Sequence, residues 1–525
     1  MRANPSTPSN ASSSLGASPA DFDLLVIGGG VNGAGIARDA AGRGLRTLLC
    51  EQSDLASATS SASTKLIHGG LRYLEYYEFR LVREALIERE TLLRAAPHII
   101  WPLRFVLPHH KALRPAWILR LGLFLYDHLG GRKLLPPTVS LDLRKARAGA
   151  PLRADFRRAF EYSDCWVEDS RLVALNALDA EERGAAIRTR TKVVAAEREG
   201  GLWRVSLEDR ETGAREEVTA RAIANAAGPW VSDVLTNVVR RNSGGSSLRL
   251  VKGSHVIVRK LYEGDHAYIF QNGDGRIVFA IPYETDFTLL GTTDIPYEDD
   301  VAAVEASENE VDYVLEAVGA YLAKPVTRSD VVRTYSGVRP LYDDAEDKSA
   351  SAVTRDYVFD LDAPAEGAPL LSIYGGKITT YRKLAEHALG QLMDALGEKT
   401  RTWTAGAALP GGDIPNADFE GFFQGLSAEY PWMETAHLRR IARAYGTRAE
   451  RVLNGASSMA DLGRHFGAGL TEAELHYLRD VEWARTGEDV LWRRSKLTLH
   501  LDEAAQRDVT AWMRAAAEAP AAIPA

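Results

Sequence analysis

The chain has 525 residues, and at a rough ~150 residues per domain this length suggests about three domains. Apolar residues make up 45% and charged residues 26%, which is the composition of an ordinary soluble globular protein. The 63 basic and 71 acidic residues give a net charge of −8, which argues against a nucleic-acid partner and means that an anionic ligand needs locally placed cations.

The first twenty residues are mostly Ser, Ala, Pro and Asn and lack the apolar segment of a secretory signal. We expect a disordered tail over residues 1–20, with a transit peptide as the alternative. Two cysteines, Cys50 and Cys165, are too few for a disulfide framework and fit a reducing compartment. The sequence has no run of about 18 uncharged apolar residues, so no membrane-spanning helix is expected.

Residues 23–51 follow the order strand, glycine-rich turn, helix, strand and acidic residue, which is typical of a dinucleotide-binding unit. Gly28 permits the tight turn, Gly30 lets the backbone approach a pyrophosphate, and Gly33 lets helix and strand pack closely. Glu51, at the end of the second strand, is expected to accept hydrogen bonds from the adenosine ribose. The alternative is a glycine-rich turn that binds no nucleotide.

The next segment, residues 57–75, favours FAD over NAD. It is rich in hydroxyl side chains and continues into Gly69-Gly70 and a helix, whereas an NAD domain usually proceeds to another strand and helix. Such a loop can run along the ribityl chain and phosphates of a flavin nucleotide. The cofactor contacts expected from this loop are Ser60, Ser61, Thr64, Lys65 and Leu66.

Residues 114–126 predict a helix with an apolar and aromatic face, and Arg132 and Lys133 follow it. The segment is too short and too charged to span a bilayer. It can lie in the interface of an anionic membrane with its basic residues toward the headgroups. The alternative is a core helix of a substrate-binding domain.

Later segments return to the nucleotide-binding domain. Three strands over residues 191–224 predict a hairpin meander inserted between its elements. A buried strand then ends at Gly228, and a strand over residues 371–376 with Gly376 precedes a helix that begins near Thr379. The nucleotide-binding domain is therefore expected to be discontinuous, with Gly228, Gly376 and Thr379 beside the cofactor.

Motifs for metal binding are missing from the sequence. The twelve histidines are scattered, and there is no paired cysteine motif and no His-Glu-x-x-His. Lys377 follows two glycines but is followed by Ile378 instead of Ser or Thr, so the segment is not a P-loop. No metal site is predicted.

Eight segments in chain order resemble the FAD-dependent, respiratory glycerol-3-phosphate dehydrogenase family. They are GGGVNGAGIARDAAGRGL, SSASTKLIHGGLRYLEYYEFRLV, FEYSDCWVEDSRLV, NAAGPWV, KGSHVIV, GTTDIPY, TYSGVRPL and YGGKITTYRKLAEHAL. The resemblance runs from about residue 22 to the C-terminus. Ala227 departs from it, because relatives often carry Thr there; a hydroxyl contact near the flavin is lost, while the backbone role of Gly228 is kept.

The resemblance implies an α/β fold with α+β character. Its parts are a discontinuous Rossmann-like FAD-binding domain of the glutathione-reductase/D-amino-acid-oxidase type, a β-sheet substrate domain and a C-terminal helical domain. The ranges expected for the FAD-binding domain are 21–95, 161–239 and 336–399. Those for the substrate domain are 96–160 and 240–335, and the helical domain is expected over 400–525.

The resemblance also implies the reaction and the partners. These are oxidation of sn-glycerol 3-phosphate to dihydroxyacetone phosphate, with hydride passing from C2 to flavin N5 and electrons passing to a membrane quinone. The FAD is expected to be non-covalent, because no His or Cys is placed for attachment. The protein is expected in the cytoplasm, peripherally attached to the anionic surface of the inner membrane, and a homodimer is an open alternative to a monomer.

Four cations in the matching segments are expected around the phosphorylated substrate: Arg72, Arg339, Arg355 and Lys377. Guanidinium groups bind a phosphate bidentately, and most of these residues are flanked by Gly, Pro or aromatic residues instead of other charges. Family precedent places all four around the substrate, with Tyr73 near them.

His255 is the candidate base, because its side chain has the most suitable ordinary pKa for accepting the alcohol proton. Arg339 is the alternative, and its first expected role is to stabilise a developing alkoxide. His255 can instead be a packed strand histidine.

Two other functions stay open. One is a flavin oxidase, of the glycerophosphate or amino-acid type, that reduces oxygen to peroxide. The other is a non-catalytic flavin-binding module, against which the clustered Arg and Lys motifs argue.

Overall fold

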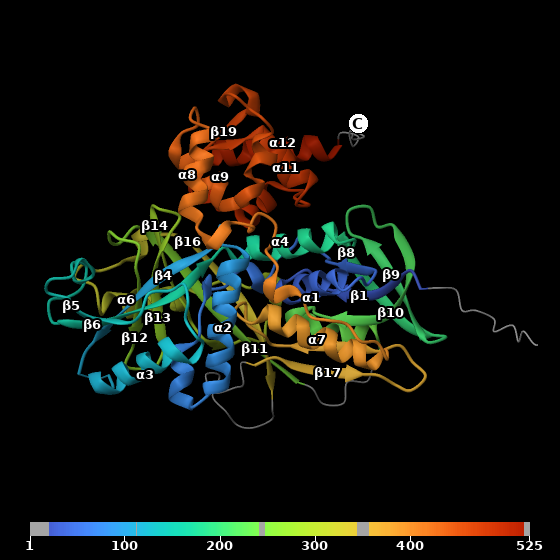
Figure 1. Ribbon diagram of the computed structural model, residues 1–525, viewed down its shortest axis with the longest axis horizontal. Coiled ribbons are helices and arrows are strands. Elements are labelled where there is room, and N and C mark those ends of the chain that lie inside the picture. Colours follow the sequence, from blue (N-terminus) through green and yellow to red (C-terminus); the bar gives the residue numbers. More distant parts are fainter. Residues whose placement is uncertain (1–19, 112, 241–246, 344–355, 519–525) are drawn as a thin grey trace, which may run out of the picture.

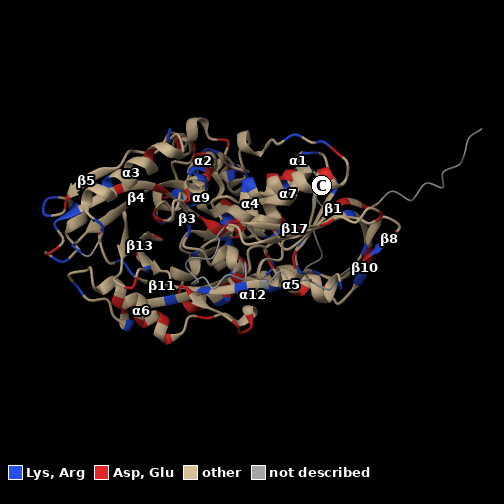
Figure 2. Ribbon diagram, turned by 90° about the horizontal axis from the view of Figure 1, so that it is seen from below, with Lys and Arg blue, Asp and Glu red and all other residues tan. Residues whose placement is uncertain are grey.

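The computed structural model describes residues 20–111, 113–240, 247–343 and 356–518, so the tail expected over residues 1–20 lies almost wholly outside the described residues. Two β-sheets with their helices lie side by side, and a helical C-terminal unit, orange to red, stands over them (Figure 1). Basic and acidic residues are interspersed over all three parts in the view of Figure 2, so the negative net charge is not gathered on one visible face.

The first sheet takes its strands from three separate stretches of the chain. Its strands are β1 Phe22–Ile27, β2 Thr47–Cys50, β7 Ala186–Arg188, β8 Thr191–Glu199, β9 Leu202–Asp209, β10 Arg215–Asn225, β17 Val358–Asp362 and β18 Leu370–Tyr374. The order is β17-β18-β10-β1-β2-β7, with β9 joining β10 and β8 joining β9. Strands β18, β10, β1, β2 and β7 are parallel, which confirms the discontinuous Rossmann-like fold.

Helices cover one face of this sheet: α1 Val31–Gly42, α4 Asp169–Glu182 and α7 Tyr381–Ala395. Helix α1 is rich in buried Ala and Gly, which lets its neighbours approach closely; a Cβ on Gly35 would lie 2.8 Å from the Tyr381 ring. The β8–β10 meander packs on the other face with residues 231–238, which include the short helix α5 Val231–Asp233. The predicted meander and the predicted helix before the second strand are both confirmed.

The second sheet has ten strands in the part of the chain that the structure describes. They are β3 Leu66–Ile67, β4 Ile100–His109, β5 Val139–Asp142, β6 Arg158–Val167, β11 Ser247–Arg259, β12 Ala267–Gln271, β13 Ile277–Tyr283, β14 Phe287–Gly291, β15 Ile295–Pro296 and β16 Val331–Asp343. Helix α6 Glu308–Gly319 packs on one face. Helices α2 Phe79–Ala95 and α3 Ala116–Leu129 pack on the other.

The expected domain boundaries stay a prediction, but three strands bear on them. Strand β3, most of β6 and the second half of β16 fall in ranges expected for the FAD-binding domain, yet they belong to the second sheet. Backbone pairing is the reason, because β3 pairs with β6, β6 with β4, and β16 with β11 along its whole length.

The C-terminal unit has a core of its own. Its elements are α8 Phe419–Glu429, α9 Thr435–Tyr445, α10 Ala449–Leu453, β19 His465–Gly467, β20 Leu470–Thr471, α11 Glu472–Asp480 and α12 Glu503–Glu518. Trp403 packs instead on the first sheet's helices, where its Nε1 donates to the Asp39 carbonyl at 3.1 Å. Within the ranges that the structure describes, no helix combines the length and apolarity needed to cross a bilayer.

Candidate functional site

A cavity of about 1230 Å³ lies between the two sheets. The turn between β1 and α1 and the end of β2 line one end, and strands of the second sheet line the other. Ligand pockets usually have volumes of roughly 300–1,000 Å³, so this cavity has room for a dinucleotide together with a small substrate.

The glycines of the first turn differ in what surrounds them. Gly28 has a φ of 105°, and a Cβ there would lie 2.7 Å from the Ala226 carbonyl oxygen. A Cβ on Gly33 would lie 1.9 Å from the Gly28 oxygen, whereas one on Gly30 would meet only the Ser60 hydroxyl, at 3.1 Å. Gly28 and Gly33 therefore permit the packing, while Gly30 and the N-terminus of α1 face the cavity, where backbone N–H groups suit a pyrophosphate.

Glu51 lies on the cavity wall, and its carboxylate holds the turn. It accepts hydrogen bonds from the backbone N–H of Gly29, at 2.7 Å, and of Ser53, at 2.8 Å. Burial raises the pKa of Glu51, against the opposing effect of these two donors. Its place at the end of β2 is where the acid of a dinucleotide-binding fold contacts ribose, and that contact stays a prediction.

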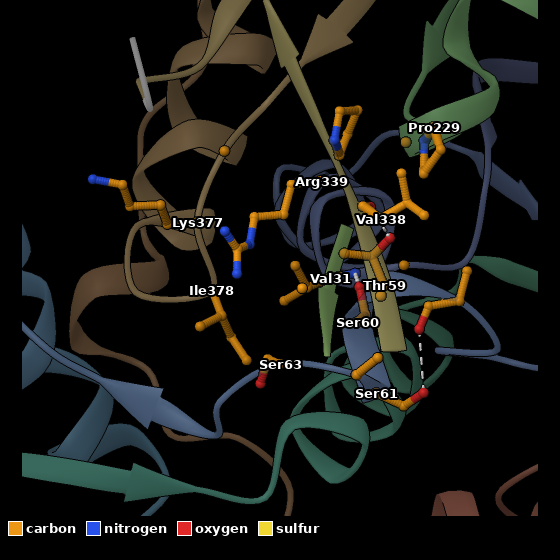
Figure 3. Close-up of a pocket in the computed structure, with 18 of the residues that line it drawn as sticks. Val31, Thr59, Ser60, Ser61, Ser63, Pro229, Val338, Arg339, Lys377 and Ile378 are labelled. Carbon is orange, nitrogen blue, oxygen red and sulfur yellow. Dashed lines mark hydrogen bonds between the residues drawn. The ribbon is translucent and has the colours of Figure 1, made fainter. Parts of the chain in front are cut away.

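The hydroxyl-rich loop bridges the two sheets beside this turn (Figure 3). The Ser60 hydroxyl accepts the Val31 N–H at 3.0 Å, and the Thr59 hydroxyl donates to the Val338 carbonyl in β16 at 2.7 Å. The members of the predicted contact set that line the cavity are Ser60, Ser61, Thr64 and Leu66. Gly228, Gly376 and Thr379 line it too, although the Thr379 hydroxyl accepts the His68 N–H at 3.2 Å.

Lys65 is placed differently from the rest of the loop. Its side chain is fully buried, and its Nζ donates to the two carboxylate oxygens of Asp169 at 2.7 and 2.8 Å. The residue is not among those that line the cavity. Any contact of Lys65 with a cofactor would therefore involve its backbone, and that contact stays a prediction.

Three of the four cations predicted around the substrate line the cavity: Arg72, Arg339 and Lys377. Arg339 Nη1 lies 2.5 Å from Asp294 Oδ1, and Lys377 Nζ lies 4.0 Å from the centroid of the Tyr73 ring. In the view of Figure 3, Arg339 and Lys377 lie on the same side of β16, and the Lys377 side chain extends away from Arg339. Arg355 lies outside the described residues.

His255, on β11, is buried at the edge of the cavity. Its Nε2 is 2.9 Å from the Thr64 hydroxyl, and its ring stacks on Tyr335 with centroids 4.8 Å apart. Burial lowers the pKa of His255 well below its ordinary value, and the charges of Arg339 and Lys65 act in the same direction. The imidazole is therefore neutral at neutral pH, and its lowered pKa makes it a weaker base than an ordinary histidine.

Sequence reasoning missed several cavity residues. Asp294, the partner of Arg339, is the one acid in the segment GTTDIPY, and that acid beside two threonines was an available signal. Trp492 and Arg493 line the cavity from the C-terminal unit, and no local pattern marks them. Among the described residues no group of three His, Cys, Asp or Glu side chains is placed to hold a metal ion.

Comparison with known proteins agrees with this geometry. Residues 23–382 match the family described as FAD dependent oxidoreductase, and residues 402–519 match the C-terminal domain of alpha-glycerophosphate oxidase. The chain is 56% identical to a D-erythritol 1-phosphate dehydrogenase of Brucella abortus, over 94% of this chain and 98% of that one. It is 54% identical to a glycerol-3-phosphate dehydrogenase of Pseudomonas aeruginosa, over 92% and 93%.

A solved structure is similar over nearly the whole chain. It is that of the glycerol-3-phosphate dehydrogenase from Bacillus halodurans complexed with FAD, with a TM-score of 0.73 and 28% identity over 94% of each chain. The residues here fit the same cofactor, because the turn and the hydroxyl-rich loop line one continuous cavity.

Proposed function

Since the chain belongs to the FAD-dependent glycerol-3-phosphate dehydrogenase family, we propose that it oxidises the C2 hydroxyl of sn-glycerol 3-phosphate to give dihydroxyacetone phosphate. Bound FAD would supply the hydride acceptor. The observation that carries the proposal is that Arg72, Arg339 and Lys377 line one cavity with His255, next to the dinucleotide-binding turn.

Each side chain has a task that follows from its surroundings. The neutral imidazole of His255 takes the alcohol proton, and the Thr64 hydroxyl orients the ring through Nε2. Arg339, held by Asp294, stabilises the negative charge that develops on the C2 oxygen. Lys377 and Arg72 bind the phosphate, and Arg355, which lies outside the described residues, is assigned the same task from the family resemblance alone.

A second substrate has a specific observation in its favour. The relative that is 56% identical to this chain is named for D-erythritol 1-phosphate, a four-carbon alcohol phosphate. The same cations would hold the phosphate of either compound, and a cavity of about 1230 Å³ leaves room for the longer chain.

Anaerobic bleaching of the flavin tests the reaction and the substrate together. Glycerol 3-phosphate is added to the oxidised protein, and D-erythritol 1-phosphate, glycerol and lactate are added to separate samples. Bleaching by a phosphate ester but not by glycerol supports the role of the cations. Equal bleaching by lactate, or none by either phosphate ester, would overturn the proposal. The ratio of kcat/KM for the two esters decides which is the substrate.

Electrons leave, on this proposal, to a membrane quinone, and α3 supports peripheral attachment. Of its fourteen residues, Leu123 and Tyr126 are the buried ones, whereas Trp117 is 69% exposed and Phe124 is 53% exposed. This favours the interfacial helix over a core helix. Stoichiometric peroxide formation with no response to a quinone analogue would favour the oxidase alternative instead.

A further inference from the structure

Among the described residues, the C-terminal unit reaches the cofactor cavity through one segment, residues 488–494. Within it Glu488, Trp492 and Arg493 line the cavity, as do residues 51–53 and 56–57 after strand β2. The end of the second strand in a Rossmann-like unit is where the adenosine half of a dinucleotide binds. The C-terminal unit therefore borders the adenosine end of the cavity, although it is distant in sequence from the nucleotide-binding motif.

Asp54 joins the loop after strand β2 to the C-terminal unit. Its side chain is 1% exposed, and its two carboxylate oxygens accept hydrogen bonds from Arg494 Nη1 and Nη2, both at 2.8 Å. Arg493 Nε donates to the same carboxylate at 2.7 Å. Arg190 Nη1 also lies 4.0 Å from Asp54 Oδ1, so three guanidinium groups surround this buried carboxylate, and charge-assisted hydrogen bonds from Arg493 and Arg494 hold it firmly.

A second acid of the same segment holds the loop from its other side. Asp489 Oδ2 accepts a hydrogen bond from Arg190 Nη2 at 2.5 Å, and its Oδ1 accepts one from Arg493 Nη2. The backbone N–H of Arg190 in turn donates to the Ser53 carbonyl at 2.8 Å. Residues 51–57 are thus held directly by Arg493 and Arg494 of the C-terminal unit and, at Ser53, by Arg190, whose side chain binds Asp489 of that unit.

We propose that Asp54, Arg493 and Arg494 are positioning residues that fix residues 51–57 in the conformation that binds the adenosine half of FAD, so that the C-terminal unit is part of the cofactor site. The loop carries Glu51, whose carboxylate orients the glycine turn through the Gly29 N–H. If residues 51–57 lose this conformation, the hydrogen bond between Glu51 and the Gly29 N–H and the contact with the adenosine half are both weakened. The inference rests on the proposed function in one respect, that FAD is the cofactor.

Dilution of the holoenzyme tests this, with the fluorescence of released FAD giving its Kd and ADP as a competitor giving the Kd of the adenosine half alone. The variants are Arg494→Gln and Asp54→Asn. We expect each to raise both dissociation constants by the same factor, about tenfold or more, as for a lost hydrogen bond to a charged group. Equal factors are expected because residues 51–57 follow strand β2, where the adenosine half of a dinucleotide binds.

The matched control is Arg448→Gln. Arg448 pairs with Glu182 of α4 through two contacts, at 2.5 and 2.6 Å, so it also joins the C-terminal unit to the first sheet's helices, and neither residue lines the cavity. We expect this variant to leave both dissociation constants within about twofold of wild type, because it loses only a part-exposed ion pair.

Three results would overturn the inference. They are unchanged dissociation constants in Asp54→Asn and Arg494→Gln, an equal loss in Arg448→Gln, or weakened FAD binding with unchanged ADP binding. Asp54→Asn, which keeps the shape of the side chain, decides the matter if Arg494→Gln does not fold. A wild-type protein purified without FAD and unable to bind it would overturn the proposed function as well as the positioning role of Asp54, Arg493 and Arg494.

Discussion

The charges at the substrate end of the cavity have different partners. Arg339 faces the carboxylate of Asp294, whereas Lys377 lies over the ring of Tyr73, and Arg72 Nη2 is 3.4 Å from the hydroxyl of Tyr76. A guanidinium held by a carboxylate keeps one orientation, which suits a group that must meet charge at a single atom. This division favours Arg339 for the reacting oxygen and Lys377 and Arg72 for the phosphate.

Replacement of Arg339 is expected to affect turnover more than binding. Arg339→Ala should lower kcat by roughly 10²–10³, the usual loss for a missing oxyanion donor, with a smaller change in KM. Asp294→Asn should lower kcat less, because the guanidinium stays while its orientation loosens. The measurement is steady-state kinetics with an artificial acceptor, corrected for flavin occupancy. A change in KM alone in Arg339→Ala would assign this residue to the phosphate instead.

The flavin is expected to be held without a covalent bond. Cys50 lines the cavity, but burial raises the pKa of its thiol to about 12, so the reactive thiolate is scarce at neutral pH. Acid precipitation should therefore leave a colourless pellet and all the yellow colour in the supernatant, as an absorbance spectrum of both fractions will show. Colour that stays in a washed pellet would mean a covalent link.

At the scale of helices and strands, the glycines of the β1–α1 turn are required for two different reasons. Gly33 faces the Gly28 carbonyl, so its side chain is excluded by backbone, whereas Gly30 faces the cavity. The two glycines therefore serve folding and cofactor binding respectively, although the sequence motif presents them alike.

Alanine substitutions should separate these two roles. Gly33→Ala should destabilise the protein by at least the ~1–3 kcal/mol typical of overpacking and abolish flavin retention. Gly30→Ala should keep a near-native Tm and lose flavin affinity. Gly122→Ala on α3 is the control, because an added Cβ there would meet no described atom within 4 Å apart from its chain neighbours and the backbone of its own helix. The flavin-to-protein absorbance ratio and the Tm of each variant are measured, and an equal Tm loss in both turn variants would refute the distinction.

Helix α3 leads to a prediction about membranes. Replacing Arg120, Arg132 and Lys133 with Gln should weaken binding to anionic vesicles, by at most about 1 kcal/mol for each charge. A charge-matched control replaces three basic residues of the C-terminal unit, Arg451, Arg507 and Arg514. Co-sedimentation at low and high salt is the measurement. Equal binding of the two triple variants to the vesicles would favour the interpretation of α3 as a core helix.

At the scale of the whole molecule, the sequence predicts those structural units whose strands, helices and turns lie within one short stretch of chain. The β1–α1–β2 unit and the β8–β10 meander have their turn residues and periodicity within a short stretch, and both are confirmed. The contact of Asp54 with Arg493 joins residues 439 positions apart, and that of Thr64 with His255 joins residues 191 apart. Such contacts depend on how the sheets and the C-terminal unit pack, which local patterns do not encode.

Buried, uncharged histidines affect the stability of the whole fold at acid pH. Burial lowers the pKa of His98 to about 3 and that of His437 to about 4, and it lowers the pKa of His255 well below its ordinary value. In the unfolded chain each histidine binds a proton near pH 6.5. As pH falls below this value, these histidines bind protons in the unfolded chain but stay neutral in the folded protein. The free energy of unfolding therefore decreases.

The expected loss is up to about 1.4 kcal/mol per pH unit for each such histidine, between pH 6.5 and its folded pKa. His98 is a suitable probe, because it is fully buried and neither ring nitrogen has a hydrogen-bond partner among the described residues. His98→Phe should therefore show a smaller drop in Tm between pH 7.5 and pH 5.5 than wild type. Carboxylates such as Asp489, whose pKa Arg190 and Arg493 lower despite burial, stay ionised in the folded and the unfolded protein over this pH range, so the difference between the two drops reports His98. Equal drops would show that protonation of His98 does not limit acid stability.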